Sequence, residues 1–124
     1  MEFQSDKPIY QQVVDRIASE IVRGDRKPGD KLPSVREFAI EVGVNANTMQ
    51  RVYREMEGQD LVETKRGQGT FVTNDPARIA ALRETLKDAY IRSFVRDMND
   101  LGISLDETVE GLQRFKGEEG EGND

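Results

Sequence analysis

The sequence predicts a mainly α-helical protein with one small β-hairpin, and three observations support that class. Apolar residues recur with a period of about 3.6 in three N-terminal segments. Only a short glycine-containing turn separates the second segment from the third, which is typical of helix-turn-helix motifs. After Gly58 the pattern changes to two short strands around a glycine-rich turn. Together these features predict a winged helix-turn-helix, followed by a short C-terminal tail of two helices.

The first helix is expected to begin near Pro8, because the fixed φ of proline suits the first helical turn. Gly24 is expected to end it, and Pro28-Gly29 then signals a turn. The helix has a broad apolar face, which comprises Ile9, Val13, Val14, Ile17, Ala18, Ile21 and Val22.

The next two helices have recognisable ends. Ser34 and Glu37 have the spacing of a capping box, Gly43 provides a stop, and Asn45 is placed to cap the third helix. The predicted inner faces are Val35, Phe38, Ala39 and Val42 in the second helix and Met49, Val52, Tyr53 and Met56 in the third. Two strands are predicted at residues 61–64 and 70–73.

A second region begins at Pro76 with a long helix that Gly102 ends. Ser104 and Glu107 then form another capping box before a short last helix. Residues 117–124 contain no apolar side chain and are expected to be disordered. The predicted organisation is therefore a winged domain over residues 1–75, a helical tail over residues 76–116 and a disordered acidic end over residues 117–124.

Composition excludes several kinds of site. The 124 residues include no Cys and no His, so disulfides, zinc sites built from these residues and Ser–His catalysis are excluded. No apolar run approaches the roughly 18 residues that span a membrane. We therefore expect that the protein is not an enzyme and has no catalytic residues, metal-binding residues or cofactor. We also expect no membrane contact and a cytoplasmic location. The formal net charge is −6 with most of the acidic excess in the C-terminal part, which neither excludes nor supports a nucleic-acid partner.

The outward face of the third helix indicates DNA binding. Asn47, Gln50, Arg51 and Arg54 recur at helical spacing opposite the apolar face. In a major groove, Asn and Gln pair with adenine, whereas Arg reaches guanine or a phosphate. We expect base contacts from Asn47, Thr48 and Gln50, and guanine or backbone contacts from Arg51 and Arg54. The alternative is an ordinary solvated helix face.

The hairpin tip and the second helix supply further candidates. Lys65 and Arg66 are consecutive cations, and Gly67 and Gly69 allow the backbone to approach another molecule closely. Arg36 lies in the first turn of the second helix, which crosses the DNA backbone in helix-turn-helix proteins. The alternatives are an ordinary glycine-rich turn and a solvated arginine.

The predicted long helix indicates a homodimer. It would extend about 37 Å, and its apolar stripe is too wide for one short helix to cover. Leu86, Tyr90, Phe94 and Met98 are the expected interface residues. The alternative is that the stripe packs on the first helix of the same chain.

Four ordered strings resemble the GntR family of bacterial regulators: PIYQQV (residues 8–13), LPSVREFA (32–39), VNANTMQRVYREME (44–57) and RGQGTFV (66–72). The Asn-x-Asn-Thr start of the third helix and the short tail resemble the YtrA-like subgroup in particular. The resemblance implies a dimer that binds double-stranded operator DNA and represses operons, often those of ATP-driven transporters. The contacts that it implies are Arg36, Asn45, Asn47, Thr48, Gln50, Arg66, Gly67 and Gly69.

The chain departs from the family pattern at two positions. Ala46 stands where family members often have a basic residue or proline, so a contact there is lost. Asp60 stands where they usually have glycine, and Asp tolerates a positive φ better than most residues. The tail is too short for the effector-binding domains of other branches, so the sequence leaves open whether a small-molecule effector exists. A winged-helix adaptor for protein–protein contact is the competing function.

Overall fold

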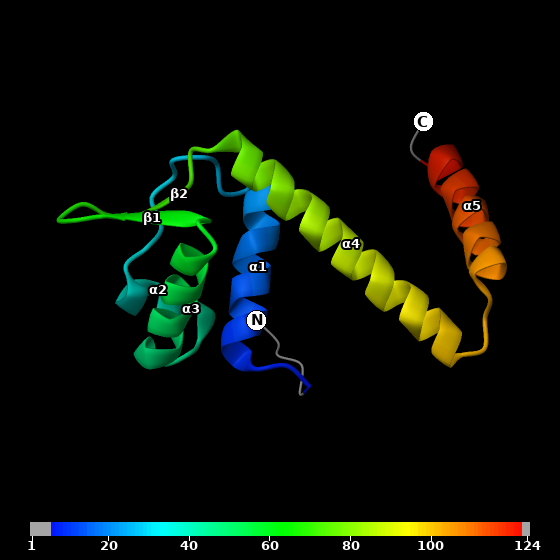
Figure 1. The fold of residues 1–124 in the computed structure, drawn as a ribbon, viewed down its shortest axis with the longest axis horizontal. Helices are drawn as coiled ribbons and strands as arrows, with labels where there is room; N and C mark the ends of the chain where they lie inside the picture. Colours follow the sequence, from blue (N-terminus) through cyan, green and yellow to red (C-terminus); the bar gives the residue numbers. More distant parts are fainter. Residues whose placement is uncertain (1–5, 123–124) are drawn as a thin grey trace. The chain divides into compact units, whose positions relative to one another are not determined.

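The computed structural model describes residues 6–122 and confirms the mainly helical winged fold (Figure 1). The hairpin extends away from three packed helices. The elements in chain order are α1 (Ile9–Arg23), α2 (Val35–Val42), α3 (Ala46–Gly58), β1 (Val62–Lys65), β2 (Gly69–Val72), α4 (Pro76–Asp100) and α5 (Leu105–Gly122).

The predicted helix signals act as expected. Pro8 precedes α1, and Gly24 ends that helix with a left-handed φ of 92°. Ser34 and Glu37 form both hydrogen bonds of the capping box at α2. The side chain of Asn45 caps α3 by accepting a 2.7 Å hydrogen bond from the backbone N–H of Thr48. Local sequence therefore determines where these helices begin and end.

The core lies between α1, α2 and α3, and all four predicted inner residues of α3 are buried. Tyr53 is the one with a polar group, and its hydroxyl donates a hydrogen bond to the carbonyl of Pro33. Burial raises the pKa of Tyr53 to about 12, so the phenol remains neutral and keeps this bond. Ile9, which was expected on the buried face of α1, is 47% exposed because it is the first residue of the helix.

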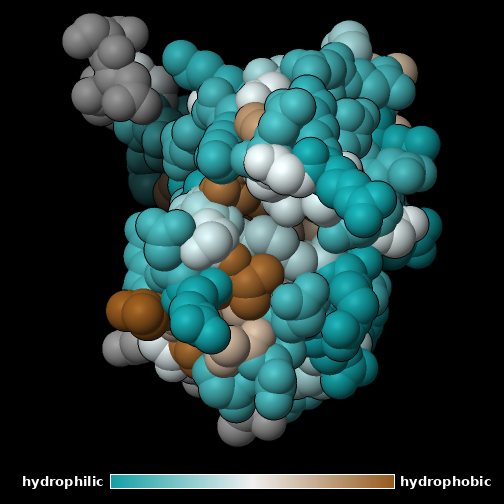
Figure 2. Space-filling model, turned by 90° about the vertical axis from the view of Figure 1, so that its left-hand side faces the viewer, coloured by the Kyte–Doolittle hydropathy of each residue, from teal (hydrophilic) through white to brown (hydrophobic). Residues whose placement is uncertain are grey.

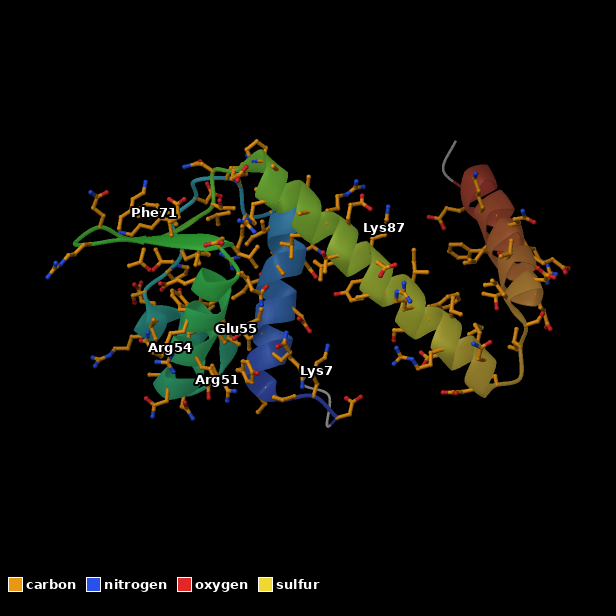
Figure 3. The ribbon with its side chains drawn as sticks, viewed as in Figure 1. Lys7, Arg51, Arg54, Glu55, Phe71 and Lys87 are labelled. Atoms are coloured by element: carbon orange, nitrogen blue, oxygen red, sulfur yellow. The ribbon has the colours of Figure 1, made fainter. Side chains whose placement is uncertain are left out.

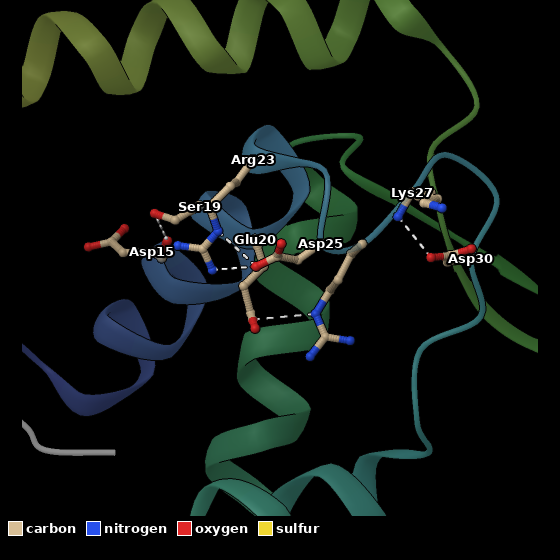
Figure 4. Close-up of polar contacts among 8 residues, drawn as sticks. Asp15, Ser19, Glu20, Arg23, Asp25, Lys27 and Asp30 are labelled. Atoms are coloured by element: carbon tan, nitrogen blue, oxygen red, sulfur yellow. Dashed lines mark hydrogen bonds and ion pairs between the residues drawn. The ribbon is translucent and has the colours of Figure 1, made fainter. Parts of the chain in front are cut away.

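A network of polar contacts stabilises the end of α1 and the turn that follows it (Figure 4). Arg23 pairs with Asp25, and Arg26 pairs with Glu20 at 3.4 Å. The backbone N–H of Lys27 donates to the carboxylate of Asp30 at 2.8 Å. These contacts fix the path of the chain toward the hairpin.

The hairpin gains a third strand-like segment that the sequence prediction lacked. β1 pairs with β2 in antiparallel register, and Lys31 forms an isolated antiparallel bridge with Phe71. The N–H of Leu32 donates to the carbonyl of Thr70 at 2.8 Å. The two strands begin and end within one residue of the predicted bounds. The loop after α1 is thereby joined to the base of the wing.

The turn between α3 and β1 contains Asp60, which stands where the family pattern has glycine. This residue adopts a φ of 58°, the left-handed conformation that glycine would take more easily. Its carboxylate also lies 3.3 Å from the guanidinium of Arg78 in the first turn of α4. The turn thus survives the substitution.

The chain divides into two compact units, Met1–Glu84 and Thr85–Asp124. The boundary falls after residue 84 rather than after the predicted residue 75, because Ile79 and Leu82 of α4 pack against the N-terminal core. No helix among residues 6–122 is long and apolar enough to cross a membrane.

In the second unit, Gly102 ends α4 with a φ of 78°, and Ser104 accepts a hydrogen bond from the N–H of Glu107. Helix α5 continues to Gly122, past residue 116, where the sequence predicted the helical tail to end. Residues 123 and 124 lie outside the described residues. Glutamate is a good helix former, and a helix that is already nucleated gains one hydrogen bond for each residue added.

Candidate nucleic-acid interface

The polar face of α3 is exposed, as its spacing predicted. Asn47, Gln50, Arg51 and Arg54 are all exposed, whereas Thr48 is half-buried. The opposite side of the helix is anchored in the core by Met49 and its apolar neighbours. The helix therefore presents amide and guanidinium groups to solvent, and its packing against the core holds it in place.

In the first turn of α3, one side chain caps the helix and others face solvent. The carbonyl oxygen of the Asn45 side chain is engaged by Thr48, which leaves its amide N–H groups for an external acceptor. Ala46, at the first helical position, is exposed and has no polar group to offer. Asn47 is consequently the first side chain of the helix that can both donate and accept hydrogen bonds toward a ligand.

The two arginines of α3 differ in their surroundings (Figure 3). The guanidinium carbon of Arg51 lies 3.7 Å from the ring centroid of Tyr10, a residue of α1. Arg54 has no such aromatic contact among the described residues. Tyr10 is not among the contact residues predicted from the sequence, because its spacing indicates only a residue at the edge of the apolar face.

The wing tip is a tight turn. The N–H of Gln68 donates to the carbonyl of Lys65 at 2.9 Å, and Gly67 has a φ of 77°. Arg66 and Gly67 are exposed at the tip, and the ammonium of Lys65 lies 4.8 Å from the ring centroid of Phe71. The turn thus presents two cations beside a backbone that another molecule can approach.

The backbone at Gly69 lies close to the side chain of Lys31. It has a φ of 126°, and a Cβ at this position would lie 2.8 Å from Cε of Lys31. The side chain of Lys31 therefore passes across the wing at Gly69. Lys31 is not among the cations predicted from the sequence. No local signal relates it to the wing, since Lys31 and Gly69 are 38 residues apart in the chain.

The candidate cations have no carboxylate partner among the described residues. Within residues 6–122, no ion pair involves Arg36, Arg51, Arg54, Lys65 or Arg66. Arg36 is exposed in the first turn of α2. The surface on the side of the hairpin tip is predominantly hydrophilic, with a few apolar side chains among the polar ones (Figure 2). This surface suits a polyanion despite the net negative charge of the chain.

A separate apolar surface lies on α4 and α5. Tyr90 and Phe94 are 59% and 40% exposed, whereas Leu86 and Met98 are half-buried. A groove in the second unit is lined by Phe94, Met98, Ile103, Glu107, Thr108, Gly111, Leu112 and Phe115. Within one chain, most of the predicted stripe therefore stays in contact with solvent.

Comparison with known proteins agrees with this geometry. Residues 9–72, which extend from α1 to the end of β2, match the family described as "Bacterial regulatory proteins, gntR family". The chain belongs to the GntR family. The matched region contains every candidate DNA-contacting residue named above, and it ends before the apolar stripe of α4.

Two curated relatives from Bacillus subtilis match nearly the whole chain. The HTH-type transcriptional regulator YhcF is 47% identical over 92% of this chain and 94% of its own length. The HTH-type transcriptional repressor YtrA is 32% identical over 90% of this chain and 87% of its own length. The chain is thus a YtrA-like GntR protein that matches most of the length of both relatives.

Two solved structures extend the comparison. A GntR-family transcriptional regulator from Listeria monocytogenes has 38% identity and a TM-score of 0.82, covering 90% of this chain and 98% of its own. The DNA-binding domain of AraR in complex with operator ORX1 has 31% identity and a TM-score of 0.54, covering 58% of this chain and 93% of its own. This GntR protein is accordingly a DNA-binding transcription regulator and not an enzyme.

Proposed function

We propose that this GntR protein is a repressor that binds an inverted-repeat DNA operator as a homodimer. The observation that supports this proposal most directly is the exposed polar face of α3, which lies opposite a buried apolar face. Its guanidiniums form no ion pair within residues 6–122. Such a helix fits the major groove, with its N-terminal residues deepest. The name of the similar YtrA protein adds support for repression rather than activation.

Each candidate residue then has a role. Asn47, Thr48 and Gln50 contact base edges, and Arg51 and Arg54 contact guanine or phosphate. The remaining residues position the protein on the DNA backbone: Arg36, Asn45, Lys65, Arg66, Gly67 and Gly69. An adaptor for other proteins would instead present large apolar anchors on this face, and the outward positions of α3 carry none.

The exposed apolar surface of α4 and α5 supports the proposed homodimer. Leu86, Tyr90, Phe94 and Met98 are the proposed interface residues of α4. On α5, Leu105, Val109, Leu112 and Phe115 are between 43% and 60% exposed. Burial of these side chains against a second copy removes them from water. It also places the α3 helices of two protomers in one assembly. Two half-sites about one DNA turn apart then match the two-fold symmetry of the protein.

Selection of DNA from a random pool tests the proposal. The full-length protein is expected to enrich an inverted repeat with half-sites 10 to 11 base pairs apart, or a multiple of about that spacing. Titration of the enriched duplex should show two protomers bound to each repeat. Enrichment of no sequence, or of a single unrepeated site bound by one protomer, would contradict the proposal.

The wing contact has its own test. Arg66→Gln should lower the slope of log K against log salt concentration by about 0.9 for each protomer, or about 1.8 for the dimer, because each protomer neutralises one phosphate fewer. Lys116→Gln on α5 removes the same charge far along the chain and should leave the slope unchanged. An unchanged slope and affinity for Arg66→Gln would show that the wing tip does not lie on the DNA backbone.

A further inference from the structure

The stacking of Arg51 on Tyr10 joins two helices at the candidate interface. Tyr10 lies in the first turn of α1 and is partly buried against the hydrophobic core, so the position of its ring is fixed. The guanidinium carbon of Arg51 lies over this ring at 3.7 Å from the centroid. That distance is a van der Waals contact with the face of the ring, and it is typical of a cation–π interaction.

An aromatic ring holds an arginine without neutralising it. Among residues 6–122 Arg51 forms no ion pair. Asp15, the next carboxylate along α1, already accepts hydrogen bonds from Lys7 at 2.8 Å and from Gln11 at 2.9 Å. A carboxylate partner would cancel the charge of Arg51 and occupy its N–H groups. Contact with the ring through one face of the guanidinium leaves its N–H edge able to bind a phosphate.

The ring also restricts a flexible side chain. A free arginine loses much of its rotational freedom when DNA binds it, and this ordering weakens the complex. An arginine that is already held against a fixed surface loses less. Arg54 has no such aromatic contact among residues 6–122, so it is the natural comparison within the same helix.

We propose that Tyr10 is a positioning residue for DNA binding, whose ring orients the Arg51 guanidinium toward a backbone phosphate before the DNA arrives. This inference rests on the proposed function, because it requires that Arg51 contacts the operator. According to this inference, the start of α1 contributes to the affinity for DNA. Arg51 contacts a phosphate rather than a guanine, since the ring of Tyr10 holds Arg51 on the side of α3 that faces α1.

Binding of the full-length protein to a duplex carrying the selected inverted repeat tests the inference. Tyr10→Leu should weaken binding about three- to tenfold, because the ring is lost and Arg51 becomes mobile. Tyr10→Phe keeps the ring and should bind like the wild type. The salt slope of Tyr10→Leu should stay the same, since Arg51 keeps its charge. Arg51→Gln should lower the slope by about 0.9 for each protomer, or about 1.8 for the dimer.

A double-mutant cycle separates positioning from simple stability. On an Arg51→Gln background, Tyr10→Leu should have no further effect on binding, whereas on an Arg54→Gln background its effect should be undiminished. Proton NMR of the free protein should show the Arg51 side chain shifted upfield by the ring in the wild type and in Tyr10→Phe, and unshifted in Tyr10→Leu. Thermal melting identifies folded variants, and Tyr10→Met replaces Tyr10→Leu if the latter is unfolded.

The outcomes distinguish this inference from the proposed function. If Arg51→Gln weakens operator binding but Tyr10→Leu does not, or Tyr10→Leu strengthens it, the inference is wrong while the proposed function stands. The same holds if Tyr10→Leu weakens binding equally with and without Arg51. If Arg51→Gln binds the operator like the wild type, the role of Arg51 and the inference fail together. If the wild type selects no repeat, the proposed function itself fails.

Discussion

Phe94→Glu is expected to make the protein monomeric and to weaken operator binding by at least about a hundredfold. Phe94 is 40% exposed in the single chain and borders the apolar groove between α4 and α5. In the proposed dimer it would be buried, and an unpaired carboxylate buried there costs several kcal/mol. The core of the DNA-binding unit does not include Phe94, so that unit should remain folded. A monomer would engage only one half-site.

Analytical ultracentrifugation and a binding titration on the same sample measure both effects, and circular dichroism checks that the helices remain. Thr85→Glu is the matched control, because Thr85 is exposed on the side of α4 away from Phe94. The control should remain dimeric and bind normally. A Phe94→Glu protein that is still dimeric and still binds tightly would show that the apolar stripe is covered within the subunit.

Asn47→Ala is expected to relax base preference at one position of each half-site by about 1–3 kcal/mol, which corresponds to roughly a 5- to 150-fold loss of discrimination. Asn47 is exposed in the first turn of α3, immediately beyond the capped residue. Its amide can donate and accept simultaneously, as pairing with adenine requires. Alanine is a good helix former, so the helix should be unaffected.

Competition titrations with single-base operator variants and with random DNA measure this effect. Gln50→Ala should relax preference at a different base pair, because residue 50 lies nearly one helical turn further along α3. Gln59→Ala, at the C-terminal end of α3, is the control and should change neither affinity nor preference. An equal loss of affinity on operator and random DNA would show that Asn47 contacts the backbone rather than a base.

Most of the secondary structure could be predicted because its signals are local. Glycine after α1, α2 and α4 adopts the left-handed conformation that ends a helix. The Ser34–Glu37 capping box and the Asn45 cap each require only residues three positions apart. Periodicity likewise predicted which side of α3 faces the core, since the geometry of a helix fixes that relation.

The exposed face of α3 and the basic turn could also be predicted, but their surroundings could not. Lys31 reaches the wing only because the loop after α1 pairs with β2. Tyr10 contacts Arg51 across the α1–α3 interface, 41 positions away in the chain. Neither contact leaves a periodic trace, because each depends on a single pair of residues.

The order of the elements, the ends of the helices and the buried face of α3 could be predicted from the amino-acid pattern, because each depends on interactions within a few residues. The motifs of the GntR family are likewise short and local. Other features depend on packing between distant segments. Such packing placed Ile79 and Leu82 on the N-terminal core, so that the compact unit extends into α4. It also set Arg51 on Tyr10 and Lys31 across Gly69. These contacts join segments that are distant in the chain, and only packing of the whole domain brings such segments together.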